Sequence, residues 1–124
     1  MMWVDVCAKY VGKRYDADNY NCRHLAAAAF TDLTGYDANS VFGTGANEGK
    51  FKRLKRGDFK RLQTPPSGLC VLILRDKYGQ THVALKQGME VLHNLGSFSF
   101  GQVCLSRWET IRDEYKDFQY WVLK

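Results

Sequence analysis

Two segments in the first third of the chain carry apolar residues at helical spacing. Over residues 2–12 the apolar positions return every three or four residues and Gly12 follows them, so we expect a helix that ends there. A second helix is expected from Cys22 to Thr34, because Asn21 is a suitable cap and a run of alanines favours helix. Gly35 is the expected stop of that helix. The polar residues between the two helices predict a loop.

The second half of the chain replaces helical spacing with short apolar runs separated by turns. We expect strands over residues 69–75, 81–86, 89–93, 102–105 and 118–123. A short helix is expected over 107–114, whereas residues 36–61 are expected to be irregular. Helices followed by an antiparallel meander predict an α+β fold, with N-terminal helices packed on a sheet of about five strands.

The chain length bounds the organisation of the protein. With 124 residues, of which 45% are hydrophobic, we expect a single domain over 1–124 with a real core. No apolar run approaches the ~20 residues of a membrane span. The first residues lack the basic start and apolar stretch of a signal peptide, so we expect synthesis in a cytoplasm and no signal peptide.

Positive charge gathers in one segment of the chain. The net charge is +5, and residues 50–61 hold seven Lys and Arg against the single acid Asp58. A solvated loop and a surface for an anionic partner are both compatible with this pattern. No helix-turn-helix, zinc-finger or stacking motif accompanies the segment, so the sequence disfavours nucleic acid as a partner.

One of the four cysteines differs from the others in its surroundings. The cysteines are Cys7, Cys22, Cys70 and Cys104. Their spacings form no CxxC pair, so we expect no structural zinc site. Because the chain shows no signal sequence, we expect no disulfide either. Three of them lie among apolar residues, where a free cysteine acts as a small hydrophobe. Cys22 instead lies between Asn21 and Arg23 at the start of the second helix, where the helix dipole favours a thiolate. Cys22 is therefore our candidate nucleophile.

A nucleophilic thiol needs a general base, and histidine is the usual choice. His24 is two residues along the same helix and so points away from Cys22. His82 and His93 fall on neighbouring predicted strands. We therefore expect His82 to be the base and His93 to be the residue that orients it, as a catalytic triad requires.

The pairing of the two strands decides whether these histidines meet. A two-residue loop at Gln87–Gly88 predicts that His82 lies directly opposite His93 on one face of the sheet. Two other interpretations stay open on residue types alone. In the first, His82 and His93 are a structural pair. In the second, Cys22, His24 and His82 are zinc ligands.

Residues in both halves of the chain resemble the NlpC-type cysteine peptidases. The segment 12–15 resembles a Gly-x-Pro-Tyr segment of that family, and 21–25 resembles its Asp-Cys-Ser-Gly motif at a helix start. Further on, 81–85 resembles the strand that carries the catalytic histidine, and 92–94 resembles the next strand, which carries a third polar residue. The short chain with aromatic residues near its end resembles phage tail-assembly members.

This resemblance implies a papain-like fold and an activity. The implied activity is hydrolysis of amide bonds in peptidoglycan stem peptides, with no cofactor. Carried over, the catalytic residues are Cys22, His82 and His93. Tyr15 or Tyr20 is a candidate for lining the substrate site, and Arg23 is a candidate for contacting an anionic group of the substrate. The backbone amide of Cys22 is a candidate oxyanion donor.

The resemblance also implies binding partners, and two other functions stay open beside the implied activity. The implied partners are a peptidoglycan stem peptide and other phage tail-tip proteins, reached after synthesis in the host cytoplasm. The chain departs from the family motif, because Asn21 replaces Asp and Arg23–His24 replace Ser-Gly. A catalytically silent structural protein of the tail tip with the same fold is the alternative. A host-encoded cysteine acyltransferase or amidase is a third interpretation.

Overall fold

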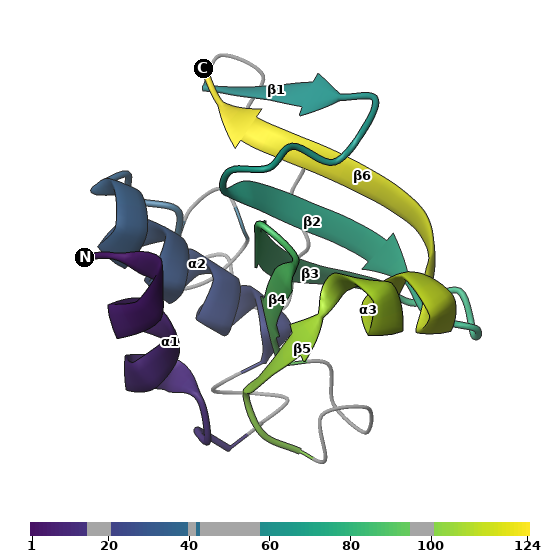
Figure 1. Ribbon diagram of the computed structural model, residues 1–124, viewed down its shortest axis with the longest axis horizontal. Coiled ribbons are helices and arrows are strands. Elements are labelled where there is room, and N and C mark those ends of the chain that lie inside the picture. Colours follow the sequence, from purple (N-terminus) through teal and green to yellow (C-terminus); the bar gives the residue numbers. More distant parts are fainter. Residues whose placement is uncertain (15–20, 40–41, 43–57, 95–100) are drawn as a thin grey trace.

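A six-stranded antiparallel sheet with helices on both faces forms the protein (Figure 1). The computed structural model describes residues 1–14, 21–39, 42, 58–94 and 101–124. Its elements in chain order are α1 (Trp3–Tyr10), α2 (Cys22–Thr34), β1 (Phe59–Leu62), β2 (Cys70–Arg75), β3 (Thr81–Gln87), β4 (Glu90–His93), β5 (Cys104–Arg107), α3 (Trp108–Glu114) and β6 (Lys116–Leu123). The predicted α+β class is confirmed. None of the helices in these ranges is long and apolar enough to cross a membrane.

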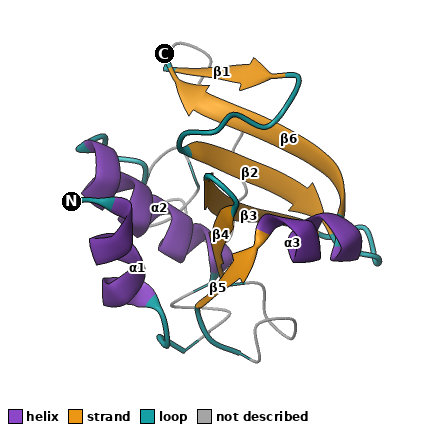
Figure 2. Cartoon of the chain, in the orientation of Figure 1, coloured by secondary structure: helices purple, strands orange, loops and turns teal. Residues whose placement is uncertain are grey.

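The strands follow the order β1-β6-β2-β3-β4-β5, so the meander from β2 to β5 is flanked by the returning strand β6 (Figure 2). Alternate residues of each strand point to opposite faces of the sheet. One face packs Val71, Val83 and Leu92 against α1 and α2, and the other packs Leu72 and Ala84 against α3. The helix that carries Cys22 therefore lies against β3, the strand that carries His82.

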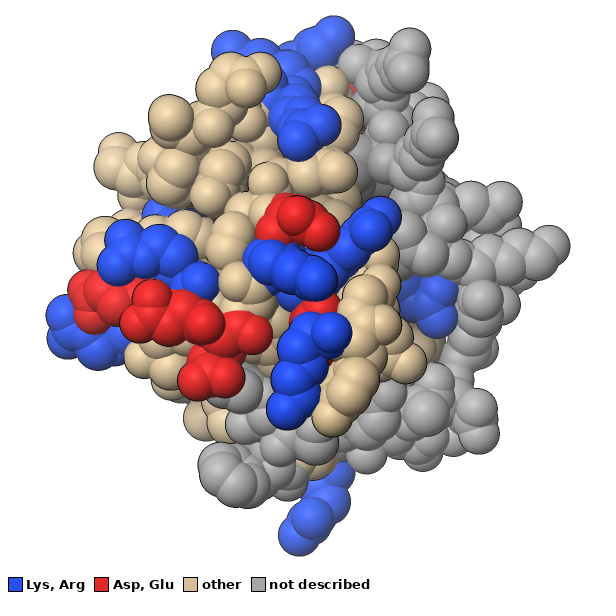
Figure 3. Space-filling model, turned by 90° about the vertical axis from the view of Figure 1, so that its right-hand side faces the viewer, with Lys and Arg blue, Asp and Glu red and all other residues tan. Residues whose placement is uncertain are grey.

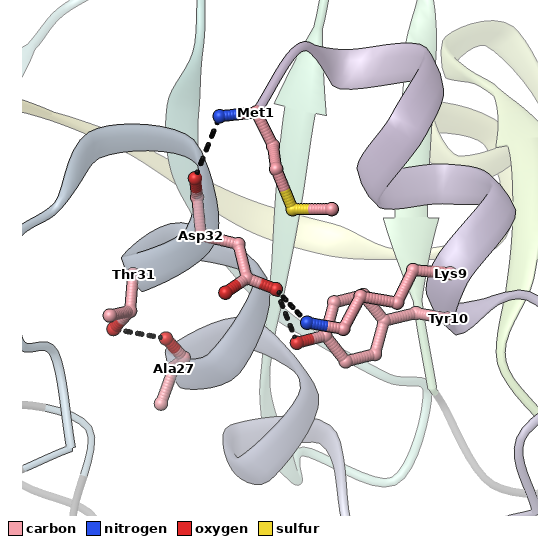
Figure 4. Close-up of polar contacts among 6 residues, drawn as sticks. All are labelled: Met1, Lys9, Tyr10, Ala27, Thr31 and Asp32. Carbon is pink, nitrogen blue, oxygen red and sulfur yellow. Dashed lines mark hydrogen bonds and ion pairs between the residues drawn. The ribbon is translucent and has the colours of Figure 1, made fainter.

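Helix α2 is fixed at both ends and along one side. Gly35 ends the helix with a φ of 79°, which glycine adopts without strain. Along its side, the Oδ2 atom of Asp32 accepts hydrogen bonds from the Tyr10 hydroxyl at 2.6 Å and from Lys9 Nζ at 2.8 Å (Figure 4). The amino group of Met1 donates to the Asp32 carbonyl at 3.3 Å. These contacts tie α1 to α2.

The predicted number of strands was one too few. Strand β1 lies inside the segment that we expected to be irregular, and it pairs with β6 through Phe59↔Leu123 and Leu62↔Tyr120. Its sequence has two adjacent cations between apolar ends, so no strand alternation is visible in it. The partner strand β6, far along the chain, stabilises β1 as a strand.

The predicted register between β3 and β4 was also wrong. The strands pair through Gln87↔Glu90 and Leu85↔Leu92, so the two-residue loop is Gly88–Met89. Gly88 takes its positive φ of 59° at the first loop position, whereas we had placed it at the second. Extended by one pair, this register sets His93 beside Ala84. The two histidines therefore share a face but are not directly opposed.

Candidate active site

Helix α2 begins with a cap that surrounds Cys22. Asn21 Oδ1 accepts hydrogen bonds from the backbone amides of Arg23 at 2.9 Å and His24 at 3.3 Å. His24 Nδ1 in turn accepts from the amide of Asn21 at 3.1 Å, which completes a capping box. The cap occupies the amides of Arg23 and His24. The amide of Cys22 lies outside it, as an oxyanion donor would require.

His82, near the start of β3, contacts both Cys22 and an acid. Its Nε2 atom lies 3.0 Å from Oδ2 of Asp76, the residue that directly follows β2. The Cys22 thiol has the largest effect on the pKa of His82, ahead of the bond to Asp76. The side chains of His82 and Asp76 are 20% and 18% exposed, so both are reachable from solvent. A thiol, an imidazole and a carboxylate therefore form one chain of contacts.

The electrostatics of this chain favour a charged imidazole. The hydrogen bond with Cys22 raises the pKa of His82, burial opposes it, and the bond to Asp76 raises it further. The bond to His82 lowers the pKa of Asp76, and the amides of Gln80 and Tyr78 also lower it. Each of the two groups therefore favours the charged form of the other.

A tight turn between β2 and β3 holds Asp76 in place. Its Oδ1 atom accepts hydrogen bonds from the amides of Tyr78 and Gln80, each at 2.9 Å. Its backbone is bonded as well, since its amide donates to the Gln80 carbonyl and its carbonyl accepts from Gly79, each at 3.0 Å. One carboxylate oxygen thus fixes the turn while the other faces His82.

Tyr115 adds an aromatic wall to this group. Its ring meets the ring of His82 edge to face, with centroids 6.3 Å apart. Burial, followed by the charge of Asp76, raises the pKa of Tyr115 to about 12, so its hydroxyl stays protonated. Sequence reasoning missed both Tyr115 and Asp76. For Asp76 a signal existed, because it begins a glycine-containing turn directly before the strand of the candidate base.

His93 occupies a different environment from the one that we expected. The side chain is completely buried, and its Nε2 atom lies 2.7 Å from the hydroxyl oxygen of Ser106 on β5. Burial lowers the pKa of His93 to about 4, so the ring is neutral at pH 7. The hydrogen bond that we expected from His93 to His82 is made by Asp76 instead.

The remaining predicted residues are only partly covered by the described structure. Tyr15 and Tyr20 lie outside the described residues. Arg23 is half-buried in the first turn of α2, beside Cys22, and its amide bonds to Asn21. Arg23 is therefore next to the candidate nucleophile, which is compatible with contact to substrate.

The other cysteines differ from Cys22 in their chemistry. All four are free thiols. Burial raises the pKa values of Cys7 and Cys70 to about 11, with a further contribution from Glu90 at Cys7. Burial also raises the pKa of Cys104. These three thiols are therefore poorly ionised at neutral pH.

The described residues contain no cluster that supports the zinc interpretation. Within the described ranges, no group of three or more His, Cys, Asp and Glu side chains is arranged to hold a metal ion. His24, one of the imagined ligands, uses Nδ1 in the helix cap.

The charged residues on the face drawn in Figure 3 are of mixed sign. Lys and Arg side chains there lie between Asp and Glu side chains. Among the described residues on this face, such interleaving gives no large field of one sign. Residues 50–57, most of the basic segment, lie outside the described residues, so a role for it in binding an anionic partner stays a prediction.

Comparison with known proteins adds no relative to this description. No protein-family model, no curated protein and no solved structure matches the chain. The resemblance to NlpC-type peptidases therefore stays a prediction.

Proposed function

We propose that this protein is a cysteine peptidase or amidase with a papain-like NlpC fold. The observation that carries the proposal is the contact chain from Cys22, at the start of α2, to His82, whose other side meets a carboxylate. A thiol bonded to an imidazole is the arrangement that activates a cysteine nucleophile. A helix start adds a favourable dipole for a thiolate.

The proposed reaction uses two steps. The thiolate of Cys22 attacks the carbonyl carbon of an amide, and the amide of Cys22 donates to the oxyanion. The protonated His82 gives its proton to the departing amine as the C–N bond breaks, which leaves a thioester. Water then attacks the thioester while His82 takes its proton. The products are an amine and a carboxylic acid, and the thiolate is regenerated.

The proposed substrate is a stem-peptide amide of peptidoglycan, and the proposed setting is a phage tail. Both follow from the resemblance of the segments around Cys22 and His82 to NlpC-type peptidases. The protein would be made in the host cytoplasm and assembled with other tail-tip proteins. The departure of Asn21 from the family's Asp is mild, because both residues cap a helix with a side-chain oxygen.

Digestion of purified peptidoglycan sacculi tests this function. Mass spectrometry of the released muropeptides should reveal new amine and carboxyl ends with the wild type and none with Cys22→Ala. The matched control is Cys104→Ala, which alters a half-buried thiol on β5 and should keep full activity. Equal hydrolysis by Cys22→Ala and the wild type would sink the proposal.

A catalytically silent structural protein of the tail tip is the second candidate. It is favoured by Arg23 and His24, which put a bulky cation and a cap-forming ring where the family motif has Ser-Gly. It predicts that the wild type leaves sacculi intact and that Cys22→Ala virions assemble normally. Wild-type hydrolysis that depends on Cys22 excludes it.

A further inference from the structure

We propose that Asp76, and not His93, is the positioning residue that orients His82. This inference rests on the proposed function, since it assigns the third member of the same catalytic group. In chain order the group is then Cys22, Asp76 and His82, with the acid supplied by the turn that precedes the base. The two oxygens of the Asp76 carboxylate have different partners.

The turn fixes the Asp76 side chain before it meets His82. Oδ1 accepts from the amides of Tyr78 and Gln80, and two backbone hydrogen bonds close the same turn. Because Oδ1 is held on both sides, the direction of Oδ2 is set by the turn and not by the histidine. Oδ2 then meets His82 Nε2 at 3.0 Å. Preorganisation of this kind is what a catalytic site requires of its supporting residues.

An ionised carboxylate at this place selects one form of the imidazole. A carboxylate only accepts hydrogen bonds, so Nε2 must carry a proton and donate it to Oδ2. In the neutral ring Nδ1 is then the acceptor nitrogen, the one able to take a proton from the Cys22 thiol. When Nδ1 is protonated, the same carboxylate stabilises the imidazolium. Asp76 thus performs both tasks of an orienting residue.

His93 lacks the features that this role needs. Its Nε2 bonds to Ser106, which ties β4 to β5, and its completely buried ring is neutral at pH 7. The observed register sets it beside Ala84 and not opposite His82. His93 is a structural residue of the sheet.

The variant Asp76→Asn distinguishes the role of Asp76 in the turn from its contact with His82. The amide oxygen of Asn can still accept from Tyr78 and Gln80, which turns its NH2 group toward His82. Nε2 must then accept a hydrogen bond, and the proton moves to Nδ1, the wrong nitrogen for taking a proton from the thiol. We expect kcat to fall by at least about 100-fold, with a smaller change in KM.

Three matched variants make the test specific. Asp5→Asn makes the same chemical change in α1, on an exposed residue, and should leave kcat unchanged. His93→Gln keeps a hydrogen-bonding group near Ser106 and should also leave kcat within about twofold once folding is verified. Asp76→Ser is the substitute test if Asp76→Asn does not fold. Its hydroxyl can still bond within the turn, but the side chain is too short to reach His82, so this variant should lose activity.

Titration of the His82 ring by NMR gives a readout that does not require turnover. Among the described residues, the titratable groups that face this ring are Cys22, Asp76 and Tyr115. The pKa of His82 should fall in Asp76→Asn and stay unchanged in His93→Gln. The opposite pattern, with His93→Gln shifting the pKa of His82 and Asp76→Asn leaving it in place, would overturn the inference.

The two proposals can fail separately. If the wild type hydrolyses sacculi through Cys22 and Asp76→Asn keeps its kcat, the role of Asp76 is wrong and the function stands. If the wild type is inert, the function is wrong, and the NMR titration still decides whether Asp76 controls His82.

Discussion

Asn21 and His24 bond to each other reciprocally at the start of α2. Asn21 Oδ1 accepts from the amide of His24 at 3.3 Å, and His24 Nδ1 accepts from the amide of Asn21 at 3.1 Å. Cys22 lies between them, so its backbone is held by the cap on both sides. The cap therefore couples the stability of the helix to the placement of the candidate nucleophile.

Removal of the cap should weaken both the fold and the site. Asn21→Ala takes away the acceptor for two amides at a helix start, which costs about 1 kcal/mol in the free energy of unfolding. Asn21→Asp keeps that acceptor and adds a favourable negative charge beside the helix start, so it should be at least as stable as the wild type. Urea unfolding of both variants measures the difference. Equal destabilisation by Ala and Asp would contradict this account of the cap.

The four thiols should react in a fixed order with an alkylating reagent. The pKa values of Cys7 and Cys70 are about 11, so roughly one such thiol in ten thousand is ionised at pH 7. Burial also slows Cys104 by raising its pKa. Peptide mapping by mass spectrometry should therefore find the label on Cys22 first. In denatured protein all four should react alike, and preferential labelling of Cys104 in the native protein would count against an activated Cys22.

His93 should make the protein less stable in acid. Its pKa is about 4 in the folded protein against 6.5 as a free side chain, so below pH 6.5 the unfolded chain binds more protons. Stability therefore falls as the pH drops from 6.5 to about 4, by roughly 3 kcal/mol at the end of that range.

The variant His93→Gln isolates this effect. His82 acts in the opposite direction, because its raised pKa adds stability that is present below 6.5 and is lost as the pH rises through its folded value. Since both proteins contain His82, the difference in unfolding free energy between wild type and His93→Gln removes its contribution. That difference should favour the wild type less as the pH falls from 6.5 to 4. A difference that does not change with pH would show that His93 is not buried as a neutral ring.

The contact between α1 and α2 should depend on a single hydroxyl. Tyr10 is only 4% exposed, and its hydroxyl donates to the Asp32 carboxylate at 2.6 Å. Tyr10→Phe should lower the unfolding free energy by about 1.5–3 kcal/mol, as expected for a hydrogen bond to a charged acceptor. Lys9→Gln removes the exposed partner of the same carboxylate and should cost much less. Chemical denaturation compares the two, and a larger loss with Lys9→Gln would be the contrary result.

Much of the fold could be predicted from local patterns. The helix from Cys22 to Thr34 has the predicted bounds, because its cap, its alanines and its glycine stop all act within a few residues. Strand β1 could not be found in this way, because it pairs with β6, and the strands β2 to β5 lie between these two in the sequence. The local pattern of apolar and polar residues gives little indication of a strand that is stabilised by a partner distant in the sequence.

Of the three residues predicted for the site, the structure brings two together, and the third lies apart from them. Cys22 and His82 were singled out by a helix start and a strand, and the structure brings them together. The prediction for His93 depended on the hairpin register. The loop lies one residue further along the chain than we expected, so His93 is not opposite His82. The sequence pattern marks Asp76 as a turn residue, a role that uses only Oδ1. The contact between its Oδ2 atom and His82 was therefore not predicted.

The most direct test of the central claim is the rate of Cys22 alkylation against pH in the wild type and in His82→Ala. If His82 activates the thiol, the wild type should react several-fold faster than the variant at pH 6–7, and the two rates should converge as the pH rises above about 9. Equal rates across the whole range would contradict the claim, because Cys22 would then react without any help from His82.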